Sequence, residues 1–217
     1  MLKSLLNLFL NSSCALCKRP TPKEFCLYCS RQLQNCHIPD PTFLWESSLP
    51  VFVWGNYGGS LKQAIKLMKY ENHPEIARPL GQWLGEGWLS HSPNSQKNCV
   101  VVPLPLNPIK EKQRGYDQAA LIAKSFCEIT GLRLKLKGLQ RVRETQALFS
   151  LSASERENTL ADAFAIGKDF YHLPNVPVLL IDDIYTTGAT ARSAGQTLQN
   201  SGIVVLGVAA VATTNKC

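Results

Sequence analysis

Residues 178–190 read Val-Leu-Leu-Ile-Asp-Asp-Ile-Tyr-Thr-Thr-Gly-Ala-Thr, and the rest of the chain can be organised around them. The four apolar residues that open this stretch are typical of a strand buried on both faces. Asp182 and Asp183 follow where we expect that strand to leave the sheet, which is where open α/β sheets bind ligands. We predict that a helix over about 191–200 comes next.

The loop between the acids and that helix consists of small residues, namely Thr186, Thr187, Gly188, Ala189 and Thr190. Its hydroxyls and backbone N–H groups, at a helix N-terminus, favour a bound phosphate. Two acids beside an anion site are compatible if the ligand is a sugar phosphate. The acids would then hold ribose hydroxyls while the loop holds the 5′-phosphate.

The stretch resembles the signature by which type I phosphoribosyltransferases bind phosphoribosyl pyrophosphate (PRPP). The apolar run, the Asp-Asp pair and the Thr-Thr-Gly-Ala-Thr loop all match it. On the Asp-Asp pair alone, an ordinary strand–turn–helix whose acids cap the next helix would be an equally good interpretation. The complete loop favours the signature.

Length and composition allow one well-packed core with a small accessory module. The chain has 217 residues, of which 45% are hydrophobic and 18% charged, as in soluble globular proteins. Its net charge of +7 favours an anionic partner. Phosphorylated metabolites and nucleic acid both qualify, and charge does not separate them.

Four of the eight cysteines form two Cys-x2-Cys pairs, Cys14 with Cys17 and Cys26 with Cys29. Four thiolates at this spacing predict a closed structural zinc site, a zinc ribbon. Redox chemistry is the alternative, but it usually involves a single Cys-x2-Cys beside a βαβ unit. Cys36 and His37 are near enough to substitute for a ligand. A metal site indicates a reducing compartment, so we expect a cytoplasmic protein.

No apolar run approaches the roughly 20 residues that a membrane-spanning helix needs. Residues 1–10 are weakly similar to a signal sequence, but their apolar core is short and Asn7 interrupts it. We interpret them as a short amphipathic helix.

Residues 49–54 predict a strand, and a helix follows with Leu61 and Met68 on its apolar face. Lys62, Lys66 and Lys69 are assigned to its other side. They form either an ordinary solvated face or a cover element that lends cations to the ligand site.

Residues 99–103 predict a second buried strand, which a proline-rich loop follows. Lys112 and Arg114 come after that loop and could bind a pyrophosphate, with Arg114 bidentate. Asp117 is suited to cap a helix that extends to about Ile129, and Gly131 to end it.

Arg141 and Arg143 alternate along an extended segment and therefore point to the same side. They could clamp a leaving pyrophosphate, or they could be surface arginines on an edge strand. Further strands are predicted at 132–136, 163–166 and 203–212.

Strand–helix alternation from residue 99 onward indicates the α/β class with a mainly parallel sheet. We divide the chain into an N-terminal helix and zinc ribbon at 1–45 and a larger domain at 46–217. Within that domain, 46–98 would form cover elements and 99–217 the core.

Several motifs occur in one order along nearly the whole chain. They are the cysteine pairs, Lys66-x2-Lys69-Tyr70, Val102-Pro103-x-Pro105, Arg114-Gly115-Tyr116-x-Gln118, Arg141-x-Arg143-x-Thr145, Arg156-x-Asn158, Ala163-Phe164 and the signature at 178–190. This order resembles the ComF/GntX family of phosphoribosyltransferase-like proteins. The resemblance implies a zinc ribbon joined to a type I phosphoribosyltransferase fold, and a link to natural competence, where single-stranded DNA is handled inside the cell.

Three positions depart from the family pattern. Asp117 stands where the family usually has Asn, Asn72 where it often has Gly, and Leu148 where Gln is expected. A negative charge at Asp117 would be unfavourable if that side chain faced pyrophosphate.

Two functions follow from the sequence. The first is transfer of ribose 5-phosphate from Mg²⁺-bound PRPP, with Asp182, Asp183, Arg141 and Arg143 as catalytic residues; the sequence identifies no general base for the acceptor. The second is a non-catalytic accessory protein or scaffold that binds single-stranded DNA and a helicase-type partner.

Overall fold

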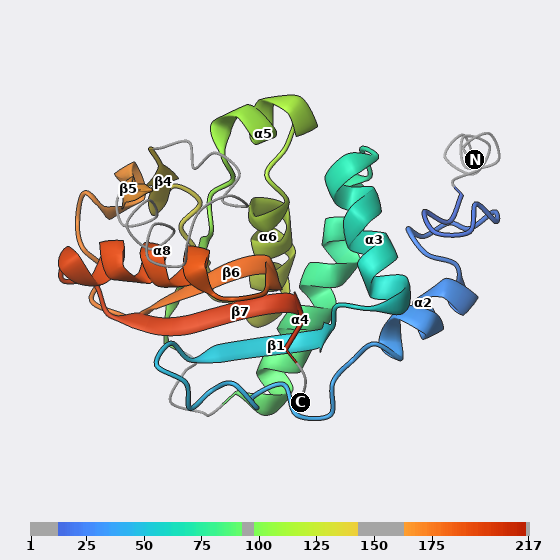
Figure 1. Ribbon diagram of the computed structural model, residues 1–217, viewed down its shortest axis with the longest axis horizontal. Coiled ribbons are helices and arrows are strands. Elements are labelled where there is room, and N and C mark those ends of the chain that lie inside the picture. The colour runs from blue at the N-terminus through green and yellow to red at the C-terminus, as the bar shows by residue number, and fades with distance from the viewer. Residues whose placement is uncertain (1–12, 93–97, 143–162, 216–217) are drawn as a thin grey trace, which may run out of the picture.

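The computed structural model describes residues 13–92, 98–142 and 163–215. The helix expected at the N-terminus, Arg143 and the segment around Arg156 lie outside these residues. The described chain forms a central sheet with helices on both faces, and the cysteine-rich segment lies at one end, beside α2 and α3 (Figure 1).

The central sheet has five strands in the order β1-β7-β6-β2-β3, and each neighbouring pair is parallel. Their bounds are Val51–Asn56 (β1), Val205–Thr213 (β7), Val178–Tyr185 (β6), Val100–Pro103 (β2) and Arg133–Leu134 (β3). The prediction of an α/β class with a parallel sheet is confirmed. The strand that carries the acid pair, β6, is central, as its apolar sequence predicts.

Alternate residues of the strands supply two separate cores. Leu179 and Ile181 join one hydrophobic cluster, whereas Val178 and Leu180 join the other. This alternation is the period-two geometry of a strand. Apolar side chains on both sides fix β6 in the middle of the sheet, and with it the residues that follow.

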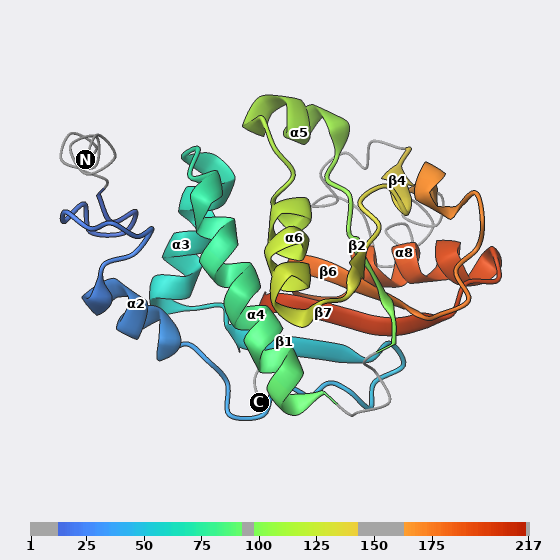
Figure 2. The same ribbon diagram turned by 180° about the vertical axis from the view of Figure 1, so that it is seen from behind.

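Helices α3 (Gly59–Tyr70), α4 (Ala77–His91) and α6 (Gln118–Thr130) contribute to the first cluster, and α8 (Ala189–Asn200) covers the opposite face (Figures 1 and 2). A 3₁₀ turn, η1 (Pro74–Ile76), precedes α4. A Cβ atom on Gly81 would lie 2.8 Å from Cβ of Ser125 in α6. Glycine at this position therefore lets α4 and α6 pack closely.

Two short strands do not join the central sheet. β4 (Leu139–Arg141) and β5 (Phe164–Ile166) pair antiparallel with each other, with Arg141 opposite Phe164. The strand predicted at 163–166 is therefore present, but as half of a separate hairpin; η4 (Lys168–Phe170) follows it. Helix α5 (Pro108–Arg114) stands beyond the end of β2.

The cysteine-rich segment packs onto the main body. The N–H of Cys14 donates to the carbonyl of Arg19 (2.8 Å), and α2 (Leu27–Gln34) follows the second cysteine pair. Cys14, Cys29 and Leu33 are buried in the same cluster as α3 and α4. The predicted domain boundary at residue 45 remains a prediction. One hydrophobic cluster contains residues from both sides of it.

Candidate functional site

Asp182 and Asp183 lie inside β6, which continues to Tyr185. The sequence predicts that the strand ends before the acids. That is correct for its pairing with β2 and wrong for its pairing with β7. Pairing with β2 stops at Ile181, opposite Pro103, while pairing with β7 continues through Asp182 and Tyr185. The acids therefore lie where the shorter neighbour has ended, so that one edge of β6 is open beside them.

Asp183 is paired with a lysine from α3. The Nζ atom of Lys69 lies 2.5 Å from Oδ2 of Asp183, and only 18% and 5% of the two side chains is exposed. Burial alone would lower the pKa of Lys69, but the Asp183 carboxylate outweighs it and raises that pKa. Lys69 is therefore a fully charged ammonium at neutral pH, held against a buried carboxylate.

Asp182 lies beside this ion pair and is hydrogen-bonded to the backbone of its neighbour. Its Oδ1 accepts a hydrogen bond from the N–H of Asp183 (2.8 Å). Burial raises the pKa of Asp182 well above its usual range, and the adjacent charge of Asp183 adds to the increase. An acid whose pKa is raised by burial and by a charged neighbour is a common feature of functional sites.

The small-residue loop and Asp182 line one hollow of about 40 Å³, which also includes Tyr185 and the first residues of α8. Gly188 is the N-cap of α8 with φ +75°, and a Cβ there would lie 2.7 Å from Cζ of Tyr185. Only glycine fits this turn without strain. The helix begins at Ala189, two residues earlier than predicted, so Ala189 and Thr190 belong to its first turn.

A second, larger hollow lies between the end of α3 and α5. It measures about 550 Å³, and we call it the cation cleft after its basic lining. The residues that line it are Lys69, Tyr70, Asn72, Lys110, Lys112, Gln113, Arg114 and Gly115. It thus contains both Lys112 and Arg114, which the sequence assigns to a ligand, and Lys69 connects it to Asp183.

Arg114 is held in place while part of its guanidinium remains unused. It donates from Nη1 to Oε1 of Gln118, and its Cζ lies 5.9 Å from the ring centroid of Tyr70. Its Nε is buried, with no hydrogen-bond partner among the described residues. A buried donor without a partner is costly, so an anion entering the cleft would satisfy it.

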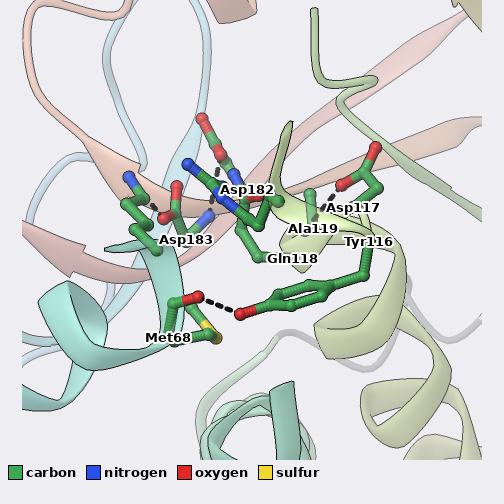
Figure 3. A network of polar contacts seen from close by, with 9 residues as sticks. Met68, Tyr116, Asp117, Gln118, Ala119, Asp182 and Asp183 are labelled. Carbon is green, nitrogen blue, oxygen red and sulfur yellow. Dashed lines mark hydrogen bonds and ion pairs between the residues drawn. The ribbon is translucent and has the colours of Figure 1, made fainter. Parts of the chain in front are cut away.

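Tyr116 joins the two sides of the cation cleft. Its hydroxyl donates to the carbonyl of Met68 in the last turn of α3, as Figure 3 shows. Asp182 and Asp183 lie close to this contact in the same view. The site therefore combines β6, α3 and the start of α6 in one network.

Arg141 comes from the β4–β5 hairpin. Its Cζ lies 5.4 Å from the ring centroid of Phe164. Burial lowers the pKa of Arg141, while the Asp182 carboxylate acts in the opposite direction. The guanidinium is therefore close enough to Asp182 to sense its charge. Its predicted partner, Arg143, lies outside the described residues.

Asp117 is not among the residues that line the cation cleft, and backbone N–H groups bind its carboxylate. Its Oδ1 accepts from the N–H groups of Ala119 (2.8 Å) and Ala120 (3.2 Å), and its Oδ2 from that of Leu106 (3.0 Å). The predicted helix cap is confirmed. Backbone N–H groups occupy the Asp117 carboxylate, whose negative charge would be unfavourable if it faced pyrophosphate. Burial still raises its pKa, although the backbone N–H groups oppose the shift.

The four predicted zinc ligands come together. The Sγ atoms of Cys14, Cys17, Cys26 and Cys29 all lie within 4.8 Å of one another. Zn–S bonds of about 2.3 Å in a tetrahedron place sulfur atoms about 3.8 Å apart, and the Cys17 and Cys26 sulfurs are 3.6 Å apart. The cluster therefore fits a metal ion with four sulfur ligands.

The pKa shifts of the cysteine thiols also favour a bound cation. Burial acts to raise the pKa of Cys14, but hydrogen bonds from the backbone of Cys26, Cys17 and Leu16 lower it to about 6. Burial and the neighbouring thiols raise the pKa of Cys29. Ionising one thiol opposes ionisation of the next, and a dication removes that conflict.

From the sequence alone, the role of Lys69 stays undecided, and Gln118 is named only as a motif position, without a role. Lys69 sits in the last turn of α3, next to Met68 on the buried face, so it turns toward Asp183, whereas Lys66 is exposed. The available signal was the motif Lys66-x2-Lys69-Tyr70, whose second lysine falls just past the apolar stripe. Gln118 follows the predicted cap, and helical periodicity does not indicate its contact with Arg114.

Comparisons with curated proteins find relatives along nearly the whole chain. Competence protein F of Haemophilus influenzae is 26% identical over 208 residues, covering 91% of this chain and 89% of that protein. Competence protein ComFC of Bacillus subtilis is 26% identical over 193 residues, covering 87% and 72%. DNA utilization protein YhgH of Escherichia coli strain K12 is 25% identical over 206 residues, covering 90% and 87%. No protein-family model matches the chain.

Among solved structures, adenine phosphoribosyltransferase from Leishmania donovani aligns with a TM-score of 0.43 at 15% identity, covering 77% of this chain and 73% of that one. The enzyme from Trypanosoma brucei aligns with a TM-score of 0.42 at 12% identity, covering 85% and 67%. Within the described parts of the chain, no helix is both long and apolar enough to cross a bilayer.

Proposed function

We propose that this chain, a member of the ComF family together with competence protein F and ComFC, binds PRPP or ribose 5-phosphate and acts in the uptake or use of DNA. One observation supports the proposal: the acid pair, of which Asp183 is buried and Asp182 partly buried, lies between a small hollow at a helix N-terminus and a cleft lined by cations. That arrangement matches a sugar that carries a phosphate at one end and a pyrophosphate at the other.

The ribose end would occupy β6 and the loop after it. Asp182 and Asp183 accept hydrogen bonds from ribose hydroxyls, and bonds to carboxylates are among the stronger hydrogen bonds. Backbone N–H groups around Gly188 and the hydroxyls of Thr187 and Thr190 receive the 5′-phosphate. The dipole of α8 adds to their attraction for an anion.

The pyrophosphate end would occupy the cation cleft. Lys112 and Arg114 supply charge there, and the buried Nε of Arg114 gains the hydrogen bond it lacks. Arg141 supplies charge from the hairpin, and Arg143, which lies outside the described residues, is the second arginine that the sequence proposes for this role. In a transfer reaction these fixed cations stabilise negative charge that develops as pyrophosphate departs.

Magnesium fits the donor set of this site. Carboxylate oxygens are its usual protein ligands, and Oδ2 of Asp183 already holds a cation, the Lys69 ammonium. Asp182 and Asp183 are the residues that would hold Mg²⁺, largely through water and the ligand. When bound it would neutralise pyrophosphate charge.

The reaction would transfer ribose 5-phosphate to an acceptor. The bond between the anomeric carbon and pyrophosphate breaks, the pyrophosphate leaves with the bonding electrons, and an acceptor nucleophile forms the new bond. The acid pair fixes the sugar during this exchange, and proximity of this kind lowers the barrier.

A second candidate function is a non-catalytic one, in which the same fold binds single-stranded DNA and a helicase-type partner. One observation favours it: Tyr70 is 76% exposed and lies among the cations of the cleft. Exposed aromatic rings between basic side chains stack bases in many single-strand binders.

A transformation assay separates the two candidates. A naturally transformable host that lacks its own copy of the gene would be complemented with wild-type protein or with Asp182→Asn plus Asp183→Asn. If ligand binding underlies the function, the double variant fails to restore DNA uptake although the protein accumulates normally. Full restoration by the double variant would favour the non-catalytic scaffold.

A thermal melt tests the ligand itself. We expect ribose 5-phosphate and Mg²⁺–PRPP to raise the melting temperature of the wild-type protein, because both bind only the folded state. Ribose without its phosphate should have no effect at the same concentration. A protein that responds to none of the three would contradict the proposed ligand.

A further inference from the structure

We propose that Lys69 is a positioning residue that exchanges between Asp183 and an anion in the cation cleft, so that filling the cleft frees Asp183 for the sugar. This inference rests on the proposed function, in which the cleft receives the pyrophosphate end of the ligand. Lys69 thereby has a defined role, and binding of the ligand would change the partner of its ammonium group.

The position of Lys69 allows both contacts. Its Nζ is 2.5 Å from Oδ2 of Asp183, and the same residue lines the cation cleft beside Tyr70 and Arg114. The Oδ2 atom accepts no hydrogen bond from other described residues, so the ammonium is its compensating group. A ribose hydroxyl that approaches this oxygen must therefore compete with Lys69.

The backbone that carries Lys69 is anchored on both sides. The carbonyl of Met68 accepts from Tyr116, as Figure 3 shows, and the ring of Tyr70 lies under Arg114. The helix end is thus held to the segment between α5 and α6. A lysine side chain has a flexible four-carbon stem, so the ammonium can change partner while the helix stays in place.

The charges make the exchange favourable only when an anion is present. Removing Lys69 from Asp183 without replacement would leave a buried carboxylate uncompensated, which is strongly unfavourable. An anion in the cleft gives the ammonium a new partner, and ribose hydroxyls satisfy the carboxylate it leaves. A ligand with both a sugar diol and a pyrophosphate therefore gains more from this site than ribose 5-phosphate alone.

A double-mutant cycle tests the exchange with metal-free inorganic pyrophosphate, titrated calorimetrically in the presence of EDTA. Asp183→Asn releases Lys69 to the cleft, so pyrophosphate should bind about tenfold more tightly than to wild type, a size typical of coupling between neighbouring sites. The same substitution in a Lys69→Met background should leave the affinity unchanged, because no lysine remains to be released.

Lys66→Met provides the matched control, since Lys66 is exposed on the same helix, outside the residues that line the cleft. In that background Asp183→Asn should still give its full gain. An equal gain with and without Lys69 would overturn this proposal alone, because removal of a nearby negative charge would then explain it. Absence of pyrophosphate binding in all the proteins would overturn both this proposal and the anion cleft of the proposed function.

Discussion

At the scale of single residues, the acid pair places two carboxylates side by side in a mainly buried strand. Asp182 and Asp183 are adjacent on one strand; Lys69 pairs directly with Asp183 and acts on Asp182 only through its charge. Burial raises the pKa of Asp182, with Asp183 adding to it, so its charged form destabilises the native state. Proteins retain such strain mainly where a ligand requires it.

Asp182→Asn should therefore stabilise the protein in the absence of ligand. A carboxyl group with a raised folded-state pKa has no cost well below the unfolded-state pKa of about 4, where it is protonated in both states; the cost grows as pH rises from there toward the folded-state pKa. We expect a gain of about 1 kcal/mol near pH 8 that disappears in acid. Urea unfolding across that pH range measures it, and a gain that is independent of pH would contradict the assignment.

Gly188→Ala should have the opposite effect. The alanine Cβ would meet the ring of Tyr185, and φ of +75° is unfavourable for a residue with a side chain. We expect a loss of about 1–3 kcal/mol and weaker binding of ribose 5-phosphate. Gly202→Ala is the control, because Gly202 has a similar φ of +79° but no neighbour within 4 Å of the added atom. Equal losses for the two variants would argue against a role for the Tyr185 contact.

At the scale of elements, the site depends on how α6 begins. The Asp117 carboxylate caps α6 and also holds the N–H of Leu106 in the loop after β2. This side chain therefore links the helix start to the loop that leads into α5. Helix α5 ends at Arg114, which lines the cleft.

Asp117→Asn tests the link. The asparagine can keep one oxygen on the helix N–H groups, but its NH₂ would then face the N–H of Leu106. We expect a loss of about 1–3 kcal/mol, since a buried donor is left unsatisfied, although Asn is the residue usual in the related family. Thermal unfolding measures this change, and a neutral or stabilising effect would show that the Leu106 contact contributes nothing.

The sequence is sufficient to predict most helices and strands. It does not predict features that depend on contacts between residues far apart in the chain. The central position of β6 follows from its unbroken apolar run, and the cap and end of α6 follow from Asp117 and Gly131, whose φ is +72°. The inward turn of Lys69 depends on a carboxylate more than 100 positions away in the chain, so helical periodicity cannot show it. The sequence also does not predict that β4 and β5 form a separate hairpin, because their residue patterns resemble those of strands in the main sheet.

At the scale of the whole molecule, the four-cysteine cluster is part of the main core. Cys14, Phe25, Cys29 and Leu33 share one hydrophobic cluster with α3, α4 and strands of the sheet. A metal that organises these residues would stabilise more than its own loop. A structural zinc contributes its binding free energy to folding.

We expect the purified protein to hold about one zinc per chain, and removal of that zinc to lower the melting temperature of the whole chain in a single transition. Elemental analysis and calorimetry measure the two effects. Cys14→Ser with Cys17→Ser should lose the metal, whereas Cys99→Ser, away from the cluster, should keep it. Full zinc content in the double variant would contradict the ribbon.

The measurement that tests the central claim most directly is a calorimetric titration of Mg²⁺–PRPP into the wild-type protein and into Asp182→Asn plus Asp183→Asn. We expect binding to the wild type and a loss of at least about a hundredfold in the variant, because two charge-assisted acceptors are removed. A melting curve of the variant confirms that it is folded. Equal affinity in the two proteins, or no binding to the wild type, would contradict the assignment of a ribose phosphate to the acid pair.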